Sequence, residues 1–291
     1  MTSRETPDIS VVLPTYNRAD ALRTNLGAIL ALEGVLEVIV VDDGSQDETA
    51  SVLASFDDPK LRVVRQPENR RQPAARNLGA ETARGAWILF AEDDCRFPPD
   101  YALVLEREAA VHGADIVGAP FIHAAAEKLE EAVRRARATA EPRIELDGEI
   151  RFPISAIETP FLPAPALIRR TVFDAVRFDE DYRGNAWREE TDFFVTAMRN
   201  GFTCVLTPAT YAYQIENWDG GARQPRLRYE YWAIRNNWRF LRRHGAWLAQ
   251  GNYLSRPVLN AQIAFVIRRF RTVSSGFLRT RWRTLTGRGQ R

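Results

Sequence analysis

The sequence predicts an α/β fold in which a mostly parallel sheet is flanked by helices. Three short apolar runs, at 9–13, 38–41 and 87–91, are continuous rather than alternating, and each ends in polar residues. Such runs are typical of parallel strands that are buried on both faces. The segments between the runs space their apolar residues as helices do. Alternation of strand and helix in this order indicates right-handed crossover connections within one sheet.

The remaining elements are predicted from local patterns. Helices are expected where apolar residues recur on one face, or where proline and glycine mark the two ends. These helices cover 20–32, 45–56 (with Asp47 as its N-cap), 73–83, 98–112 and 124–140. Further strands are expected at 61–64, 116–119, 166–168 and 203–206, and a proline-rich loop region at 141–165.

The composition indicates one enzyme-sized body. The chain has 291 residues, of which 45% are hydrophobic, so it can form one large domain or two small ones. Its two cysteines, Cys95 and Cys204, favour a reducing compartment over a disulfide framework. We see no signal-peptide pattern and no run of about 18 apolar residues, so we expect no membrane-spanning helix and a cytoplasmic location.

The net charge of +2 conceals a strong asymmetry. Residues 222–291 contain 16 arginines and one acid, Glu230, whereas the other 221 residues carry 24 basic and 37 acidic side chains. The acidic body argues against nucleic-acid binding, and the basic end is expected to meet an anionic surface.

The basic end also carries aromatic residues. Within 256–291, arginines lie beside Phe265, Phe270, Phe277 and Trp282, a combination found in helices at a membrane interface. This segment could attach the protein peripherally to the inner face of the membrane. The alternative is that the helices of the tail pack on the rest of the chain.

Polar clusters follow each of the three buried runs. The first run leads into Thr15, the second into Asp43, and the third into Glu92, Asp93 and Asp94. The carboxyl ends of parallel strands meet at one edge of a sheet, so these groups should converge there. Converging carboxylates repel one another unless a cation lies among them, and Mg²⁺ or Mn²⁺ would accept oxygen ligands. The sequence therefore predicts a divalent-metal site at this edge.

Five motifs in order resemble those of family 2 glycosyltransferases, which are inverting enzymes with the GT-A fold. They are Pro14-Thr15-Tyr16-Asn17-Arg18, Val41-Asp42-Asp43-Gly44-Ser45, Ala75-Arg76-Asn77-Leu78-Gly79-Ala80, Phe90-Ala91-Glu92-Asp93-Asp94 and Glu189-Glu190-Thr191-Asp192. The resemblance implies a GT-A catalytic domain over 1–221, with a nucleotide-binding part at about 8–118 and an acceptor part at about 119–221. A basic helical C-terminal extension would follow over 222–291.

The resemblance also implies roles for single residues. The expected donor-binding residues are Pro14, Thr15, Tyr16, Asn17, Asp43, Arg76 and Asp93, with Asp43 accepting a hydrogen bond from the base. The expected metal ligands are Asp94, Glu92 and Gln214, where Gln214 stands in place of a histidine of many relatives. The expected base is Glu190, with Glu189 as the second choice. Ordinary structural roles remain open: Asp43 could cap a turn, and the acids at 189–192 could begin a helix.

The predicted activity is metal-dependent, inverting transfer of a sugar from a nucleotide-sugar, with a UDP-sugar favoured, to an acceptor hydroxyl. The expected acceptor is a saccharide or a lipid-linked molecule, in the synthesis of cell-surface polysaccharide or glycolipid. Self-association stays open. Two other classes also stay open: a sugar-phosphate nucleotidyltransferase, which would release pyrophosphate, and a non-enzymatic binding protein with a basic tail.

Overall fold

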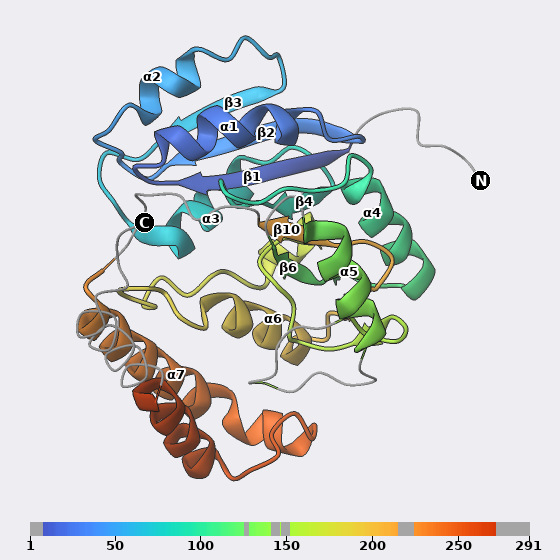
Figure 1. Ribbon diagram of the computed structural model, residues 1–291, viewed down its shortest axis with the longest axis vertical. Coiled ribbons are helices and arrows are strands. Elements are labelled where there is room, and N and C mark those ends of the chain that lie inside the picture. The colour runs from blue at the N-terminus through green and yellow to red at the C-terminus, as the bar shows by residue number, and fades with distance from the viewer. Residues whose placement is uncertain (1–7, 125–127, 141–145, 147–151, 215–223, 272–291) are drawn as a thin grey trace, which may run out of the picture.

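The computed structural model describes residues 8–124, 128–140, 146, 152–214 and 224–271 (Figure 1). Its strands are β1 (Ile9–Thr15), β2 (Val35–Asp42), β3 (Leu61–Arg65), β4 (Trp87–Phe90), β5 (Ile116–Gly118), β6 (Phe121–His123), β7 (Ile157–Glu158), β8 (Ala166–Arg169), β9 (Cys204–Leu206) and β10 (Ala212–Gln214). Its helices are α1 (Ala19–Leu30), α2 (Thr49–Ala54), α3 (Arg71–Thr82), α4 (Tyr101–His112), α5 (Leu129–Ala138), the 3-10 helix η2 (Arg170–Asp174), α6 (Glu189–Arg199) and α7 (Arg226–Gln250). Residues 258–271 form a further helix.

Eight strands form one sheet in the order β3-β2-β1-β4-β8-β5-β9-β7, and β10 pairs with β6 in a second, two-stranded sheet. The four strands β3, β2, β1 and β4 are parallel, as the sequence predicts. β8 is antiparallel to both of its neighbours, and β7 is antiparallel to β9. The α/β fold is therefore confirmed, with the parallel half placing the ends of β1, β2 and β4 at a common edge.

The continuous apolar runs are explained by a core on each face of the sheet. Successive side chains of a strand point to opposite faces. Val11 packs with the core that contains Leu22 of α1, whereas Val12 packs with the core that contains Ala75 of α3. Both valines have no exposed surface. Each residue of such a strand is therefore apolar, because each faces one of the two cores.

Most expected elements are present with shifted ends. The helix expected at 45–56 is only α2, and its N-cap is Glu48, so the prediction of Asp47 is wrong by one residue. The Asp47 carboxylate still accepts a hydrogen bond from the backbone N–H of Thr49 at 3.0 Å. The helix expected at 124–140 is α5, and 125–127 lie outside the described residues. No helix of the described chain has the length and apolarity needed to cross a bilayer.

The C-terminal helices pack on the body of the protein. Phe240, Leu241 and Leu248 of α7 are buried in the same core as Phe193 of α6. In Figure 1, α7 and the following helix lie beside α6, on the side away from β1 to β3. The structure thus confirms that α7 packs on the body of the protein through one of its sides.

The expectation that Phe265 contributes to a membrane-facing aromatic surface is wrong. Phe265 is only 2% exposed, and its ring centroid lies 6.0 Å from that of Trp187. The guanidinium of Arg188 lies 5.9 Å from the same ring. Periodicity shows that a helix is amphipathic, but it does not show which apolar side meets the body. Phe277 and Trp282 lie outside the described residues.

A buried polar network joins α6 to α7. Asp192 of α6 is 1% exposed and accepts a hydrogen bond from the Tyr182 hydroxyl at 2.9 Å. His244 Nε2 lies 2.8 Å from the same carboxylate, and Arg243 Nη1 lies 3.1 Å from its second oxygen. Arg199 Nη1 faces His244 Nδ1 at 3.1 Å, and because a guanidinium can only donate, Nδ1 accepts and Nε2 carries the proton towards Asp192.

We expect Asp192→Ala to lower the free energy of unfolding by about 3 kcal/mol, because it leaves buried donors of Tyr182 and His244 without an acceptor. Urea unfolding measures this change. The control is Glu131→Ala, which removes an exposed pair with Arg135 at 3.0 Å and should cost about 0.5 kcal/mol or less. Equal stability of the two variants would show that the network does not fasten α6 to α7.

Candidate active site

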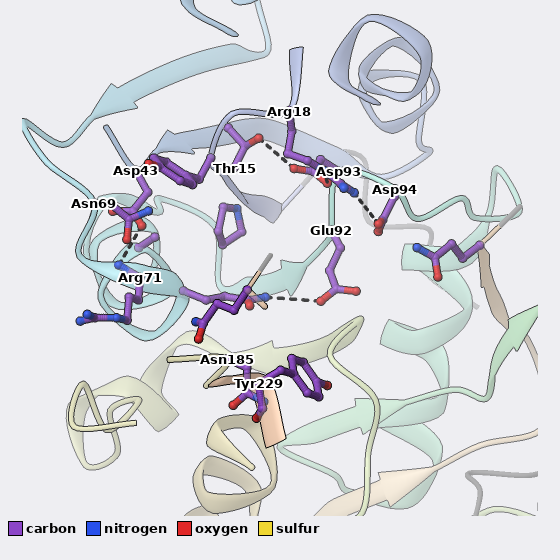
Figure 2. A pocket seen from close by; sticks show the side chains of 16 residues that line it. Thr15, Arg18, Asp43, Asn69, Arg71, Glu92, Asp93, Asp94, Asn185 and Tyr229 are labelled. Carbon is purple, nitrogen blue, oxygen red and sulfur yellow. Dashed lines mark hydrogen bonds and ion pairs between the residues drawn. The ribbon is translucent and has the colours of Figure 1, made fainter. Parts of the chain in front are cut away.

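Most of the expected donor-binding residues and all of the expected metal ligands meet at one cavity at the carboxyl ends of β1, β2 and β4. The cavity has a volume of about 490 Å³. It is lined by Pro14, Thr15, Tyr16, Arg18, Asp43, Asn69, Arg71, Gln72, Ala75, Glu92, Asp93, Asp94, Asn185, Gln214, Gln224 and Tyr229 (Figure 2). Parallel pairing explains the convergence, because Thr15 is in register with Asp42 on the neighbouring strand.

Asp43 lies in the wall of this cavity and also fixes the loop before α3. One carboxylate oxygen accepts hydrogen bonds from Gln66 Nε2 at 2.8 Å and the Arg70 backbone N–H at 2.7 Å. The other accepts the Arg71 backbone N–H at 2.8 Å. Burial raises the pKa of Asp43, although these backbone hydrogen bonds act in the opposite direction. The second oxygen retains lone-pair capacity for one more donor in the cavity.

Arg18 binds the two aspartates that follow β4. Its Nε donates to Asp93 at 2.9 Å and its Nη2 to Asp94 at 2.5 Å (Figure 2). The hydroxyl of Thr15 donates to the other oxygen of Asp93 at 2.8 Å. Burial and the charge of Asp94 nevertheless raise the pKa of Asp93 to about 6. Both oxygens of Asp93 are thus used by Thr15 and Arg18, whereas the ion pair of Asp94, which also lines the cavity, uses one of its oxygens.

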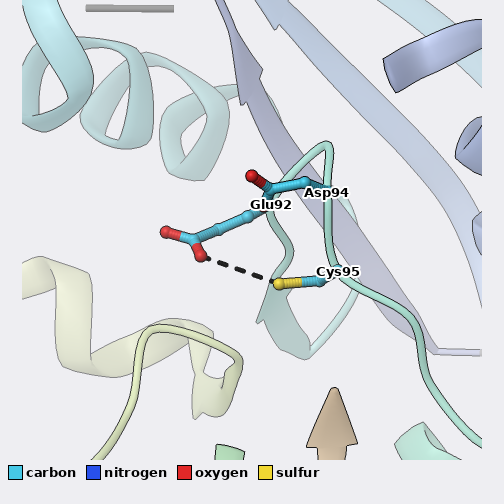
Figure 3. Close-up of side chains that lie close together, drawn as sticks. All are labelled: Glu92, Asp94 and Cys95. Atoms are coloured by element: carbon cyan, nitrogen blue, oxygen red, sulfur yellow. Dashed lines mark hydrogen bonds between the residues drawn. The ribbon is translucent and has the colours of Figure 1, made fainter. Parts of the chain in front are cut away.

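Glu92, Asp94 and Cys95 bring their ligand-type atoms within 4.8 Å of one another (Figure 3). Cys95 Sγ lies 3.6 Å from a Glu92 oxygen, and burial holds the pKa of its thiol well above the ordinary value. A thiol that remains protonated is a poor ligand, and hard cations prefer oxygen. Burial and the charge of Glu190 raise the pKa of Glu92. The donor set of Glu92 and Asp94, together with Gln214 in the same cavity wall, therefore fits Mg²⁺ or Mn²⁺ without the sulfur.

Arg76 is buried in a cluster of acids, one of which, Glu92, lines the cavity. Its side chain is 1% exposed; Nη1 donates to Glu189 at 2.7 Å and Nη2 to Glu190 at 2.7 Å. A Glu92 oxygen lies 3.6 Å from the same Nη2. These carboxylates raise the pKa of the guanidinium despite its burial. Arg76 thereby joins α3, the end of β4 and the start of α6.

The glycine of the Ala75–Ala80 motif explains how Arg76 reaches this position. A Cβ atom on Gly79 would come within 2.2 Å of Val12 Cγ1 on β1. The absence of a side chain thus lets α3 approach the sheet closely. The cost of a side chain at this point would be a shift of α3, and with it of Arg76.

The two glutamates at the start of α6 differ in environment. Glu189 is 3% exposed, and within the described part of the chain its second oxygen has no hydrogen-bond partner. Burial raises the pKa of Glu189, while Arg76 lowers it. The side chain of Glu190 is 31% exposed and lines a second cavity of about 850 Å³.

The second cavity adjoins the first. Both are lined by Glu92 and Gln214. The rest of the second wall is largely apolar or aromatic, with one cation. It consists of Pro120, Phe121, Ile122, His123, Ala132, Arg135, Ala136, Thr139, Phe152, Pro163, Ala164, Pro165 and Glu190. A carboxylate of α6 therefore faces a space that continues into the acidic cavity.

The structure places two expected donor residues differently. Arg76 is covered by its carboxylate partners and is not in the cavity wall that the described residues form. Asn17 braces the loop after β2: its backbone N–H donates to Ser45 Oγ at 2.9 Å and its Oδ1 accepts from the Gln46 N–H at 2.7 Å. The other expected donor residues and metal ligands all line the first cavity.

Several cavity residues were not expected from the sequence. They are Arg18, Asn69, Arg71, Gln72, Ala75, Asn185, Gln224 and Tyr229. Arg18 stands in the first motif, so its position was a signal that could have been used. Asn185 donates to the backbone oxygen of Tyr229 at 3.1 Å, and this contact between the loop before α6 and α7 has no local sequence signature.

Comparison with known proteins identifies the family of this chain. A family model described as Glycosyl transferase family 2 matches residues 10–177, which is more than half of the chain. The chain therefore belongs to glycosyltransferase family 2, a family of transferase enzymes.

Two named relatives each match more than 60% of this chain. Succinoglycan biosynthesis protein ExoU of Rhizobium meliloti strain 1021 is 32% identical over 212 residues, which are 69% of this chain and 60% of that protein. Validoxylamine A glucosyltransferase of Streptomyces hygroscopicus subsp. jinggangensis is 34% identical over 206 residues, 61% of this chain and 48% of that protein. The chain thus spans between about half and three fifths of the length of these relatives.

A similar fold is found in S. aureus TarS. The crystal structure of TarS 1–349 in complex with UDP has a TM-score of 0.55 and 17% sequence identity, over 94% of this chain and 92% of that one. At this identity the likeness shows the fold alone. It confirms the GT-A expectation for the architecture.

Both cysteines should resist thiol reagents in the folded protein. Cys95 and Cys204 are free and fully buried, and burial raises the pKa of Cys95 well above its usual range. We expect no reaction with Ellman's reagent at pH 8 over minutes, and reaction of two thiols per chain in guanidinium chloride. Rapid modification of one thiol in the native protein would show that Cys95 is open to the cavity and available as a ligand.

Proposed function

We propose that this protein is an inverting, divalent-metal-dependent glycosyltransferase that moves a sugar from a nucleotide-sugar, preferably a UDP-sugar, to an acceptor hydroxyl. The observation that carries this proposal is the junction of two cavities at Glu92 and Gln214, with Glu190 in the wall of the second. A donor in the first cavity and an acceptor in the second would meet beside this carboxylate. The names of the relatives, one in succinoglycan biosynthesis and one a glucosyltransferase, support polysaccharide or glycoconjugate synthesis.

The first cavity offers groups suited to each part of a nucleotide. Asp43 has an oxygen that can accept a base N–H, and Tyr16 lines the wall nearby. Arg18 and Arg71 supply cationic groups for phosphate oxygens, for which a guanidinium fork has suitable geometry. The complex of TarS with UDP, a protein of similar fold, supports the choice of base.

Asp94 would be the principal metal ligand, with Glu92 and Gln214 as further oxygen donors. When bound, a divalent cation would neutralise the donor diphosphate and stabilise it as a leaving group. Arg18 binds both Asp93 and Asp94, so it also offsets their mutual repulsion. A cation bound at Asp94 would compete with Arg18 for that carboxylate, and the guanidinium could then bind the donor phosphates.

Glu190 would act as the general base. It is the more exposed of the two glutamates, and its second oxygen is not used by the hydrogen bond to Arg76. Glu190 accepts the proton of the acceptor hydroxyl while that oxygen attacks the anomeric carbon from the face opposite the diphosphate. The bond between the sugar and the diphosphate breaks, nucleoside diphosphate leaves, and the configuration inverts.

Arg76 would be a positioning residue in this reaction. Its two donors fix Glu189 and Glu190 in one orientation, and its charge keeps the acids near Glu92 from repelling one another. Orientation of a base by a buried group is a common requirement for efficient proton transfer.

The test of function is a thermal-shift panel of nucleotide-sugars with and without Mn²⁺, followed by product analysis. We expect a UDP-sugar with Mn²⁺ to raise the melting temperature, because a ligand of the folded state stabilises it, and UDP rather than pyrophosphate to be released. EDTA should remove activity reversibly. Asp94→Asn should lose nearly all activity while keeping its fold by circular dichroism, whereas Asp20→Asn, an exposed acid of α1, should not. Full activity in EDTA would rule out the metal.

The base is tested by two neighbouring substitutions. We expect Glu190→Gln to lower kcat by about 10²-fold or more with little change in donor affinity, since only a proton acceptor is removed. Glu189→Gln weakens the link to Arg76 and should lower kcat less. A large loss in Glu189→Gln alone would make Glu189 the base. No loss in either variant would place the base elsewhere.

A further inference from the structure

The C-terminal helices expose an unusual number of large apolar side chains. Among the described residues, seven of the eleven exposed large hydrophobic side chains lie between 226 and 271. On α7 they are Leu227, Tyr231 and Trp238, with exposed fractions of 79%, 55% and 38%. Their spacing of four and seven residues places them on one side of the helix. This stripe is not used to pack α7 on the protein body.

The helix 258–271 carries a second stripe. Leu259, Ile263, Ile267 and Phe270 are 60%, 48%, 48% and 63% exposed. They also follow a helical spacing of three to four residues. The opposite side of this helix is the packed one, where Phe265 is buried.

The two helices form an antiparallel hairpin. The Asn237 side chain donates to that of Gln262 at 2.7 Å. Glu230, about two helical turns before Asn237, pairs with Arg269 at 2.6 Å. Residue numbers thus rise along one helix where they fall along the other, so the two helices are antiparallel. Figure 1 shows α7 and this helix side by side.

Both stripes lie on the same side of this hairpin. With about 100° of rotation per residue, the α7 stripe lies roughly 90° from the line through Glu230 and Asn237. The second stripe lies roughly 105° from the line through Gln262 and Arg269, in the same rotational sense. When two antiparallel helices face each other along these lines, stripes that are turned from the lines in the same rotational sense point to the same side of the helix pair. The seven side chains thus form one surface, which we call the hairpin face.

The charge around the hairpin face identifies its partner. Residues 226–271 contain ten arginines and one acid, Glu230, and Arg269 already neutralises that acid. Nine of these arginines are exposed, and two of the nine, Arg239 and Arg243, pair with Asp179 of the body. By helical spacing, Arg228, Arg235 and Arg242 flank the apolar stripe of α7. A second copy of the chain would bring a surface of equal positive charge against this one, which opposes self-association. An anionic bilayer supplies the opposite charge together with an apolar interior.

We propose that the hairpin face is a docking surface for an anionic lipid membrane. Leu227, Ile263 and Phe270 would enter the boundary between headgroups and acyl chains, where the amphipathic rings of Tyr231 and Trp238 are also favoured. The arginines would bind the headgroup phosphates. The surface differs from the segment expected from sequence, because it includes α7 and excludes Phe265.

Membrane docking would bear directly on the choice of acceptor. Tyr229 lines the first cavity and lies between Leu227 and Tyr231 of the hairpin face, so the first turn of α7 separates cavity from membrane. This consequence rests on the proposed function: a transferase held in this way would act on a saccharide carried by a membrane lipid. The docking itself does not depend on that activity.

The test is sedimentation of the intact chain with vesicles. Vesicles of phosphatidylcholine containing 30 mol% phosphatidylglycerol should bind the protein at low salt, and pure phosphatidylcholine vesicles at least tenfold less. The double variant Ile263→Ser/Phe270→Ser should lower the partition coefficient at least tenfold. The matched control is Val63→Ser/Val111→Ser, which removes two exposed valines from β3 and α4 and should bind like the natural sequence.

Three results would overturn the proposal: no binding of the intact chain to anionic vesicles, equal binding by the two double variants, or a dimer in solution that Ile263→Ser/Phe270→Ser dissociates. The nucleotide thermal shift, measured on the same variants, separates this outcome from a failure of the proposed function. Vesicle binding with no response to any nucleotide-sugar would leave docking in place and remove the transferase. A nucleotide response without vesicle binding would do the reverse.

Discussion

The site depends on the ion pairs that the buried Arg76 guanidinium forms with three carboxylates. Glu92 follows β4, and Glu189 and Glu190 begin α6, so the sequence brings three carboxylates to one point from segments about a hundred residues apart. Without a cation among them, burial and mutual repulsion would drive these groups to bind protons or to move apart. Arg76 offsets part of this charge with a group that belongs to the protein, and the remaining negative charge faces the cavity.

A second set of contacts joins α6, which carries Glu189 and Glu190, to the C-terminal helix α7. The α6 helix is fixed on one side by Arg76 and on the other by the network of Asp192 with Tyr182, His244 and Arg243. The arginine-rich segment therefore has two kinds of residue. Some arginines bind acids of the body, as Arg239 does with Asp179 at 2.7 Å, and help to hold the helix that carries the glutamates. Others, such as Arg228, Arg235 and Arg242, are exposed and by helical spacing flank the apolar stripe of α7. The arginines of the tail therefore contribute both to packing on the body and to the charge of its exposed side.

The sequence predicted the nucleotide-binding half of the fold well, for identifiable reasons. Val11 and Val12 face opposite cores, so the apolar run of β1 could be recognised as a doubly covered strand. Parallel pairing then required Thr15, Asp43 and Asp94 to lie at one edge. By contrast, Phe265 was assigned to the wrong side of its helix, because amphipathic spacing is the same whether the apolar side meets protein or another partner. The first motif does not by itself single out Arg18 as a site residue, since its partners Asp93 and Asp94 lie far along the chain.

The sequence by itself determined the α/β class, the family and the edge of the sheet at which the acids gather, because these follow from local periodicity and from motifs a few residues long. Tertiary structure alone decided that Arg76 binds Glu189 and Glu190 instead of lining the cavity, and that α7 supplies Tyr229 to the cavity wall. It also decided that the exposed sides of two helices combine into the hairpin face. These features depend on contacts between residues tens to more than a hundred positions apart, and local pattern carries no information about which distant group will compensate a buried charge or cover an apolar side.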